Sequence, residues 1–446
     1  MRREGTTITV SASPSLQGEL TPPGDKSISH RAAILNSLSM GEAEILNFAP
    51  GRDCLATVTC LRNLGVRIRR TGWDNSPTLS VRGKGPDGLR EAANVLDARD
   101  SATTMRLLGG LLSGRPFLSV ITGNASLRSR PMDRLIEPLR LMGADISGRG
   151  GDAFAPLVIR GKRLHGIEFS LPVPSAQIKS ALLFAGLHAS GDTTVCQPSP
   201  SRDHTERMLS MMEARLRTEQ NLIYLRPLDR PLTPISLRVP GDISSAAYFL
   251  VAGAVHPDAR VVIRDCGVNP TRTGIIDALL EMGARLTILN ERVVAGEPVA
   301  DIVVESSNLS GIEVGGDLIP RLIDEIPVLA VAGCFARGRT VIRNAGELRV
   351  KESDRIATVS RELSRLGASI ETLPDGMIIH GGSILSGTEV SSHRDHRLAM
   401  SLGVAALLAQ GKTSIRYAHA TQVSYPAFWK HIRQLSSCRG DSSEPG

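Results

Sequence analysis

Aromatic side chains are scarce in this chain of 446 residues: Phe, Tyr and Trp together make up 3%. Proteins that bind nucleic acid by stacking bases need aromatic side chains on a basic surface, so the composition disfavours that class. No stretch approaches 18 uninterrupted apolar residues, and the first ten residues, MRREGTTITV, hold no secretory signal. We therefore expect a cytoplasmic protein that does not bind a membrane.

Cysteine is also rare, and its spacing does not suit a metal. The six cysteines form no C-x-x-C pair and no pattern with histidine that is typical of zinc sites. We expect reduced thiols and no metal. The polar end of the chain, residues 436–446, is expected to be a flexible tail.

Lysine is used sparingly, at seven positions against 45 arginines. The formal net charge is +7, from 52 basic and 45 acidic side chains. Background composition explains this total, but it does not explain why two scarce lysines, Lys26 and Lys351, stand inside polar clusters. The length, with 41% hydrophobic and 22% charged residues, fits a soluble globular protein of two or three domains.

One structural unit recurs six times, at intervals of about 65 to 80 residues. Each copy has an apolar run rich in Ala and Leu, typical of a buried helix, and then a turn and a β-branched run. The six copies span residues 32–48, 106–123, 181–197, 248–265, 328–345 and 401–418. Five turns contain a glycine, which is expected to form the left-handed cap of the preceding helix. These glycines are Gly41, Gly114, Gly191, Gly338 and Gly411.

A second, amphipathic helix follows in five of the copies. It ends in related signatures, such as LRNLGVRI at 61–68 and LLEMGARL at 279–286. The unit is thus strand, buried helix, strand, amphipathic helix, strand. Because its helices are of two kinds and its connections are short, the pattern predicts layered α/β or α+β domains and not a solenoid.

Polar segments precede all six buried helices, and most carry Ser, Thr or Asp, which cap helix N-termini. The segments are PPGDKSISHR (22–31), RDSATTMR (99–106), VPSAQIKS (173–180), VPGDISSA (239–246), LIDEIP (322–327) and HRDHR (393–397). Helix N-termini bind anions, and several segments add a cation, namely Lys26, Arg31, Arg106 and Arg397. Capping alone would explain any one segment. If equivalent units pack so that these ends converge, the six together predict a site for a small ligand with phosphate and carboxylate groups.

Two acidic motifs could move protons. Asp324 and Glu325 precede a proline and a long apolar helix, where they could cap the helix or act as acid/base groups. ELRVKESDR at 347–355 alternates basic and acidic residues, as the solvated start of a helix does, but it contains the rare Lys351. Neither motif identifies a reaction by itself.

Eight longer motifs stand in order along nearly the whole chain. They are PGDKSISHR (23–31), RPMDRLIEPLRLMGA (130–144), PSAQIKSALLFAGL (174–187), SRDHTERML (201–209), NPTRTG (269–274), IDEIPVLA (323–330), LRVKESDR (348–355) and DHRLAMS (395–401). Together they resemble the 5-enolpyruvylshikimate-3-phosphate (EPSP) synthase family. The resemblance implies a two-domain, inside-out α/β barrel, with three βαβαββ repeats in each domain and the active site in the interdomain cleft. Residues 1–24 plus 240–446 would form the first domain, and residues 25–239 the second.

The same resemblance implies a reaction. In that family the enolpyruvyl group of phosphoenolpyruvate passes to the 5-hydroxyl of shikimate 3-phosphate, phosphate leaves, and no cofactor is needed. The methylene carbon of phosphoenolpyruvate must gain a proton while the hydroxyl loses one, so the site needs acid/base groups and fixed positive charge. By motif match Asp324 resembles the base toward the 5-hydroxyl, and Lys26 with Glu352 the proton carriers. Which of them protonates the methylene stays open.

The motif match also implies the substrate ligands. Shikimate 3-phosphate would be bound by Lys26, Ser27, Arg31, Ser175, Ala176, Gln177, Arg202, Asp324 and Lys351. Phosphoenolpyruvate, or the inhibitor glyphosate in its place, would be bound by Lys26, Ala102, Arg130, Gln177, Glu352, Arg355 and Arg397. The alternatives are surface salt bridges for the arginines and helix caps for Ser27 and Ser175. Structural roles are expected for His30, His204, His393 and His396.

RDSAT at 99–103 departs from the GNAGT or GNSGT that most members carry. Ala102 replaces a glycine that lies against phosphoenolpyruvate and glyphosate in the family, so its methyl group should crowd the longer inhibitor more. Overpacking of this size costs about 1 to 3 kcal/mol, which gives roughly tenfold to hundredfold discrimination. Asp100 stands in place of the family's Asn, and a carboxylate there is unfavourable near a phosphate unless Arg99 or Arg106 pairs with it.

Other features also resemble the naturally glyphosate-tolerant bacterial branch. They are SRDHTERML, SAQIKS and the absence of a lysine near SYPAF (424–428). We therefore expect weak glyphosate binding.

Two rival functions remain. The enolpyruvyl transferase that acts on UDP-N-acetylglucosamine is the nearest within the superfamily, but it lacks the PGDKSISHR and RVKESDR signatures. From a different class, a basic nucleic-acid-binding protein would carry clustered Lys/Arg runs, and the chain has none. The expected partners are therefore the two small substrates and no nucleic acid, and the expected state is a monomer.

Overall fold

The computed structural model describes residues 6–72 and 76–436, and the chain divides into two compact units. Unit 1 consists of Met1–Pro22, Gly241–Arg292 and Pro298–Gly446; unit 2 consists of Pro23–Pro240 and Val293–Glu297. The expected first domain includes all of residues 240–446, whereas the structure assigns Val293–Glu297 to unit 2. This segment is held within unit 2, where Arg207 Nη1 donates a hydrogen bond to Gly296 O at 2.8 Å.

Unit 2 is built around three helices that are buried on nearly all sides. These are α1 (Lys26–Leu38), α3 (Ala102–Ser113) and α5 (Ala176–Gly186). In α1 every residue after Lys26 is buried. Three amphipathic helices alternate with them along the chain: α2 (Arg52–Asn63), α4 (Asp133–Leu141) and α6 (His204–Met211).

Three four-stranded sheets surround these helices. The first has the order β14-β3-β5-β4, the second β6-β7-β9-β8 and the third β10-β11-β13-β12. The strands of the first are β14 (Leu237–Arg238), β3 (Met40–Leu46), β5 (Thr78–Lys84) and β4 (Arg67–Thr71). Those of the second are β6 (Leu96–Asp97), β7 (Leu118–Thr122), β9 (Phe154–Arg160) and β8 (Asp145–Arg149). Those of the third are β10 (Glu168–Ser170), β11 (Thr193–Cys196), β13 (Leu222–Leu225) and β12 (Leu216–Glu219).

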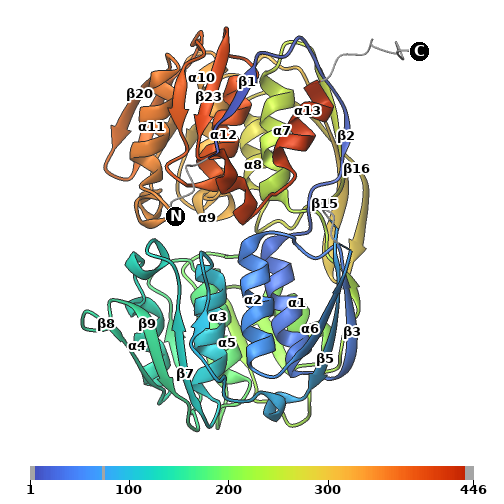
Figure 1. Ribbon diagram of the computed structural model, residues 1–446, viewed down its shortest axis with the longest axis vertical. Helices are drawn as coiled ribbons and strands as arrows, with labels where there is room; N and C mark the ends of the chain where they lie inside the picture. The colour runs from blue at the N-terminus through green and yellow to red at the C-terminus, as the bar shows by residue number, and fades with distance from the viewer. Residues whose placement is uncertain (1–5, 73–75, 437–446) are drawn as a thin grey trace. The chain divides into compact units, whose positions relative to one another are not determined.

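The strands alternate buried and exposed residues, so each sheet turns one face to the helices and the other to solvent. In Figure 1 the helices α3 and α5 lie between the strands β7 to β9 and the sheet that contains β3 and β5. Helices inside and sheets outside give this unit a single apolar core.

Unit 1 repeats the arrangement with its own core. Its buried helices are α7 (Ile243–Val255), α10 (Ile326–Phe335) and α12 (His396–Ala406). The other helices are α8 (Gly274–Glu281), α9 (Leu318–Leu322), α11 (Arg355–Arg365) and α13 (Phe428–Ser436).

The sheets of unit 1 have the orders β16-β17-β15-β2, β18-β19-β21-β20 and β1-β23-β22. The first contains β16 (Arg285–Val294), β17 (Glu297–Glu305), β15 (Ala259–Gly267) and β2 (Leu16–Leu20). The second contains β18 (Glu313–Val314), β19 (Arg339–Ile342), β21 (Gly376–His380) and β20 (Ser369–Leu373). The third contains β1 (Ile8–Ser11), β23 (Lys412–Arg416) and β22 (Glu389–Ser391).

The predicted α/β class and the six buried helices are confirmed. Each of these helices begins inside one of the six polar segments, at Lys26, Ala102, Ala176, Ile243, Ile326 and His396. Five begin behind a side chain that accepts a hydrogen bond from a backbone N–H of the first turn, as an N-cap does. The five caps are Asp25, Ser101, Ser175, Asp242 and Asp395.

The prediction for the glycines is wrong. Gly114 does cap α3, but its φ of −96° is not left-handed. Gly191, Gly338 and Gly411 have positive φ, yet they lie in the turns beyond the helix ends. The caps of α5, α10 and α12 are Leu187, Ala336 and Leu407, because these helices end before the turn that leads to the strand.

The end of the chain, the thiols and the helix lengths bear on three expectations from the sequence. Ser436, where the expected tail starts, is the last residue of α13, and the rest of that segment lies outside the described residues. The five cysteines within the described ranges form no disulfide bond. Among the same residues, no helix is both long and apolar enough to cross a bilayer.

Candidate substrate-binding clusters

In unit 2 the first two turns of the buried helices are joined by hydrogen bonds. Gln177 Nε2 in α5 donates to Thr103 Oγ1 in α3 at 3.0 Å. Arg31 Nη2 in α1 donates to Ser180 Oγ in α5 at 2.8 Å. Helix α1 also packs against α3. Three N-termini, with their free N–H groups and positive dipole ends, therefore lie at the same end of this unit, which favours anions.

Lys26 and Ser27 open helix α1. The Lys26 side chain is 20% exposed, and its Nζ lies 3.0 Å from Asp53 Oδ2 in α2. Arg202 Nη1 donates a long hydrogen bond to Ser27 Oγ at 3.4 Å. The structure thus brings together Ser27 and Arg202, two residues expected to bind shikimate 3-phosphate from opposite ends of the unit's sequence.

Arg31 lies deeper than the other expected ligands, with a side chain almost fully buried. Its Nε donates to Thr205 Oγ1 at 2.6 Å and its Nη1 donates to Ser27 O at 2.9 Å, in addition to the bond to Ser180. Burial lowers the pKa of Arg31 to about 10, although nearby Glu206 acts in the opposite direction. Arg31 therefore ties the start of α1 to α5 and α6.

Gln177, an expected ligand of both substrates, is bonded to Arg106, which belongs to neither expected set. Its Oε1 accepts a hydrogen bond from Arg106 Nη1 at 2.5 Å, and Arg106 Nη2 donates to Pro131 O at 3.1 Å. Pro131 follows Arg130, whose side chain is largely buried. Ser175 caps α5 and Ala176 is the first residue of that helix, so their backbone N–H groups belong to its first turn.

The carboxylate of Asp100 is bonded to a residue that the sequence did not suggest. Asn124 Nδ2 donates a hydrogen bond to Asp100 Oδ1. Two residues on, Ala102 begins α3 and is 6% exposed, so its methyl group stands at the helix N-terminus.

In unit 1 the N-termini of α7, α10 and α12 are likewise bonded to one another. Ser244 Oγ in α7 donates a short hydrogen bond to Glu325 Oε1, at the start of α10. Arg397 Nη1 in α12 lies 3.6 Å from the same oxygen. Glu325 is thus buried beneath the surface of this end of the unit and joins three helices.

Arg355 is the centre of a buried charge network. Its Nε lies 2.8 Å from Asp395 Oδ2, its Nη2 2.6 Å from Glu352 Oε2 and its Nη1 3.5 Å from Asp324 Oδ1. Burial alone would lower the pKa of Arg355, but the carboxylates of Asp395 and Glu352 outweigh it and raise the pKa. In the same way Arg355 holds the pKa of Asp395 below its ordinary value, against the effect of burial. The guanidinium of Arg355 is a fixed cation.

Arg397 is the second fixed cation of unit 1. Its Nη2 lies 3.5 Å from Asp324 Oδ2, so Asp324 has a guanidinium near each of its oxygens. Burial would lower the pKa of Arg397, but Asp324, with Tyr248 and Glu325, raises it well above the ordinary value.

Exposure separates the carboxylates of this network into two kinds. Asp324 and Glu352 have side chains that are 20% and 21% exposed, whereas those of Asp395 and Glu325 are wholly buried. The Lys351 side chain is 26% exposed, with Nζ 3.6 Å from Glu347 Oε2. Partial burial lowers the pKa of Lys351, while Glu347 and Asp324 act to raise it.

Sequence reasoning missed the residues that hold the expected ligands in place. Asp53 faces Lys26, Asp395 faces Arg355, and the buried pair Lys179 and Glu206 lies behind Ser201. Asp395 stood in a recognised capping segment, and Lys179 is one of the scarce lysines. Within the described residues no group of three or more His, Cys, Asp or Glu side chains is arranged to hold a metal ion.

Each unit thus presents three helix N-termini with buried arginines and partly exposed lysines or carboxylates, an arrangement typical of proteins that bind small polyanions. The family model for EPSP synthase (3-phosphoshikimate 1-carboxyvinyltransferase) matches residues 10–432. The chain therefore belongs to the EPSP synthase family.

Individual relatives agree over almost the full length. A 3-phosphoshikimate 1-carboxyvinyltransferase of Herpetosiphon aurantiacus is 52% identical over 96% of this chain and 99% of its own. The same-named protein of Desulforudis audaxviator is 53% identical over the same shares. The solved structure of EPSP synthase from Acinetobacter baumannii superposes on this chain with a TM-score of 0.84 and 42% sequence identity. The match covers 96% of this chain and 98% of the Acinetobacter chain.

Proposed function

We propose that this protein transfers the enolpyruvyl group of phosphoenolpyruvate to the 5-hydroxyl of shikimate 3-phosphate and releases phosphate. The product, 5-enolpyruvylshikimate 3-phosphate, leads to chorismate and the aromatic amino acids. Relatives of more than 50% identity that carry the name 3-phosphoshikimate 1-carboxyvinyltransferase support this proposal.

One observation carries the assignment of acid/base groups. A side chain can exchange a proton with a substrate only if solvent or ligand can reach it. Lys26, Asp324, Lys351 and Glu352 are each 20% to 26% exposed. By contrast, Asp53 beside Lys26 and Asp395 beside Arg355 are buried. We assign Asp324 as the base toward the 5-hydroxyl, and Lys26 with Glu352 as the carriers of the methylene proton.

The arginines supply fixed positive charge. Arg355 and Arg397 are held by carboxylates and stay charged at all working pH values, so they would bind the anionic groups of phosphoenolpyruvate without rearranging as the tetrahedral intermediate forms and collapses. The proposed set for this substrate is completed by Lys26, Ala102, Arg130, Gln177 and Glu352.

Shikimate 3-phosphate would be bound by a second set. It consists of Lys26, Ser27, Arg31, Ser175, Ala176, Gln177, Arg202, Asp324 and Lys351. The hydrogen bonds of Arg31 to protein use one N–H of each of its three nitrogens, and guanidinium has five N–H donors. Arg31 would therefore contribute both charge and the position of Ser27.

We also propose that the enzyme tolerates glyphosate. The methyl group of Ala102, at the start of α3, supports this, since it would crowd an inhibitor longer than phosphoenolpyruvate. We further propose that the enzyme works in the cytoplasm as a monomer, without metal or cofactor.

A phosphate-release assay tests the proposal. Phosphoenolpyruvate is supplied with shikimate 3-phosphate or with UDP-N-acetylglucosamine, with and without EDTA. Release with the first acceptor alone, unchanged by EDTA, is the expected result. Release only with UDP-N-acetylglucosamine would show that the protein is the enolpyruvyl transferase that acts on that acceptor. Tight, salt-dependent binding of nucleic acid on filters without any release would favour the binding-protein alternative.

A further inference from the structure

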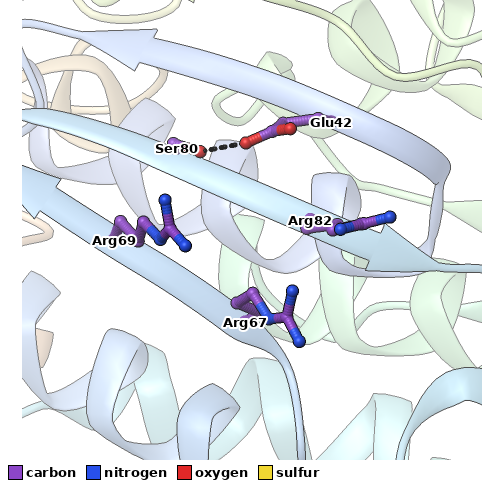
Figure 2. Close-up of a pocket in the computed structure, with 5 residues that line it drawn as sticks. All are labelled: Glu42, Arg67, Arg69, Ser80 and Arg82. Atoms are coloured by element: carbon purple, nitrogen blue, oxygen red, sulfur yellow. Dashed lines mark hydrogen bonds between the residues drawn. The ribbon is translucent and has the colours of Figure 1, made fainter.

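Three arginines line a hollow on the outer face of the first sheet of unit 2. Arg67 and Arg69 come from β4 and Arg82 from β5, and the hollow has a volume of about 80 Å³. The remaining lining residues are Glu42 from β3 and Ser80 from β5. Figure 2 shows these five side chains on three neighbouring strands.

The charges in this hollow are not balanced. Arg67 and Arg82 stand directly opposite each other in the strand register, and like charges in that position are destabilising. Glu42 is opposite Arg82 on the other side, but its carboxylate accepts a hydrogen bond from Ser80 Oγ at 2.6 Å instead. In the part of the chain that the structure describes, no carboxylate lies within 4.0 Å of the three guanidiniums. The lining set therefore carries a net charge of +2.

The internal repeat shows that the fold does not require this arrangement. In the second sheet of the same unit, IRGK at 159–162 stands where VRGK at 81–84 stands in the first, and GADI at 143–146 where GVRI stands at 65–68. There Asp145, and not an arginine, is opposite Arg160. Other exposed arginines of unit 2 also have acidic partners, such as Arg230 with Glu213 at 2.9 Å.

A larger hollow adjoins the first and shares two of its arginines. It has a volume of about 440 Å³. Its lining residues are Met40 and Gly41 from β3, Arg67 from β4, and Arg82, Gly83 and Lys84 from β5. Lys84 adds a further cation, and the exposed side chain of Met40 adds apolar surface. A phosphate in the small hollow would thus have room beside it for an organic group.

We propose that Arg67, Arg69 and Arg82 form a binding site for the phosphate group of a small anion, either inorganic phosphate or a phosphate monoester. Guanidinium groups bind phosphate oxygens in pairs of parallel hydrogen bonds, and a dianion matches the net charge of the lining set. Ser80 donates its hydroxyl proton to Glu42 and is therefore not counted among the donors to the phosphate. None of these residues belongs to the sets assigned to the two substrates. The proposed phosphate site can therefore be tested independently of the proposed reaction.

Titration calorimetry with inorganic phosphate, at constant ionic strength in chloride, tests the site. The full chain is compared with the double variant Arg67→Gln/Arg82→Gln and with the matched control Arg160→Gln from the equivalent sheet. Phosphate binding at the substrate clusters is common to all three proteins. We expect the full chain and the control to show the same phosphate-binding component. In the double variant its affinity for phosphate should fall at least tenfold. The turnover number for phosphate release from the substrates should be the same in all three proteins.

A second arm distinguishes the two sources of phosphate. Phenyl phosphate that binds this component at least threefold more tightly than inorganic phosphate would identify a monoester, and equal affinity would identify the free ion. Superimposable phosphate isotherms for the full chain and the double variant would overturn the proposal and leave the three arginines as a solvated surface. Should the double variant not fold, Arg69→Gln is expected to weaken the same component, and an unchanged isotherm for it would also overturn the site.

Discussion

Lys179 and Glu206 form an ion pair inside unit 2, with Lys179 Nζ 2.6 Å from Glu206 Oε1 and neither side chain more than 7% exposed. Lys179 Nζ also donates to Gln197 Oε1 at 3.3 Å and to Ser201 O at 3.2 Å. One scarce lysine thus joins α5, α6 and the loop that leads into Arg202.

Removing one partner of this pair should destabilise the protein strongly. Lys179→Met leaves the Glu206 carboxylate buried without its cation, a loss of about 3 to 5 kcal/mol in the free energy of unfolding. The double variant Lys179→Met/Glu206→Leu should recover most of it, because the second charge is removed as well. Urea unfolding measures both. The exposed Lys162→Met, in the same unit, is the control. A double variant as unstable as the single one would contradict the ion-pair account.

The same lysine should affect one substrate more than the other. Because Lys179 holds the carbonyl of Ser201, its loss should displace Arg202, which we assign to shikimate 3-phosphate. In the refolded double variant we expect the KM for shikimate 3-phosphate to rise about tenfold and the KM for phosphoenolpyruvate to change less than threefold. Equal rises in both constants would mean that the pair acts only on stability.

Asp324→Asn should remove the proposed base with little change in shape. General acid–base groups contribute about 10²- to 10⁴-fold to rate, so the turnover number should fall at least a hundredfold while the protein stays folded. Asp317→Asn, an exposed aspartate just before α9, should leave turnover unchanged. Near-normal turnover for Asp324→Asn would refute the base assignment.

Ala102→Gly should restore sensitivity to glyphosate. Removing the methyl group relieves a contact of about 1 to 3 kcal/mol, so the inhibition constant for glyphosate should fall about tenfold to hundredfold. The KM for phosphoenolpyruvate serves as the internal control and should change less than threefold. Wild-type protein whose inhibition constant already lies below that KM would contradict tolerance.

His30 should make unit 2 sensitive to acid. It is fully buried beside Thr57, and burial lowers its pKa from 6.5 to about 3, with Asp53 opposing the shift. The unfolded chain therefore takes up a proton first as the pH falls, so stability present above pH 6.5 is lost progressively between pH 6.5 and 3. At pH 5 the loss amounts to about 2 kcal/mol.

His30→Gln has no proton to gain in this range, so its urea midpoint should change less between pH 7 and pH 5 than that of the wild type. His165→Gln, at an exposed position, should behave as the wild type does. If the His30 variant and the wild type lose the same stability, the buried histidine is not the source of acid lability.

The features that could be predicted from the sequence are local or periodic. Asp25 and Asp242 could be identified as caps because a cap bonds to an N–H only two or three residues further along the chain. The buried helices could be identified because apolar runs recur with a regular interval. The assignment of Asp324 and Glu352 came from the family resemblance and not from such local rules.

The partners of the charged groups could not be predicted in the same way. Lys26 meets Asp53, 27 residues away, because α1 packs against α2 in one rotation and register, which composition does not encode. The glycine error has a related cause. The helix ends are set by the start of the following strand and its pairing, and not by the nearest residue that tolerates a positive φ.

The strands β1 and β2 bear on how the chain is synthesised. They precede unit 2 in the sequence, yet β1 pairs with β23, where Ile8 faces Ile415, and β2 pairs with β15. Most of unit 2 is one continuous stretch, Pro23–Pro240, which can complete its core while the ribosome is still making unit 1. The strands β1 and β2 are therefore synthesised before unit 2 but can pair only after it.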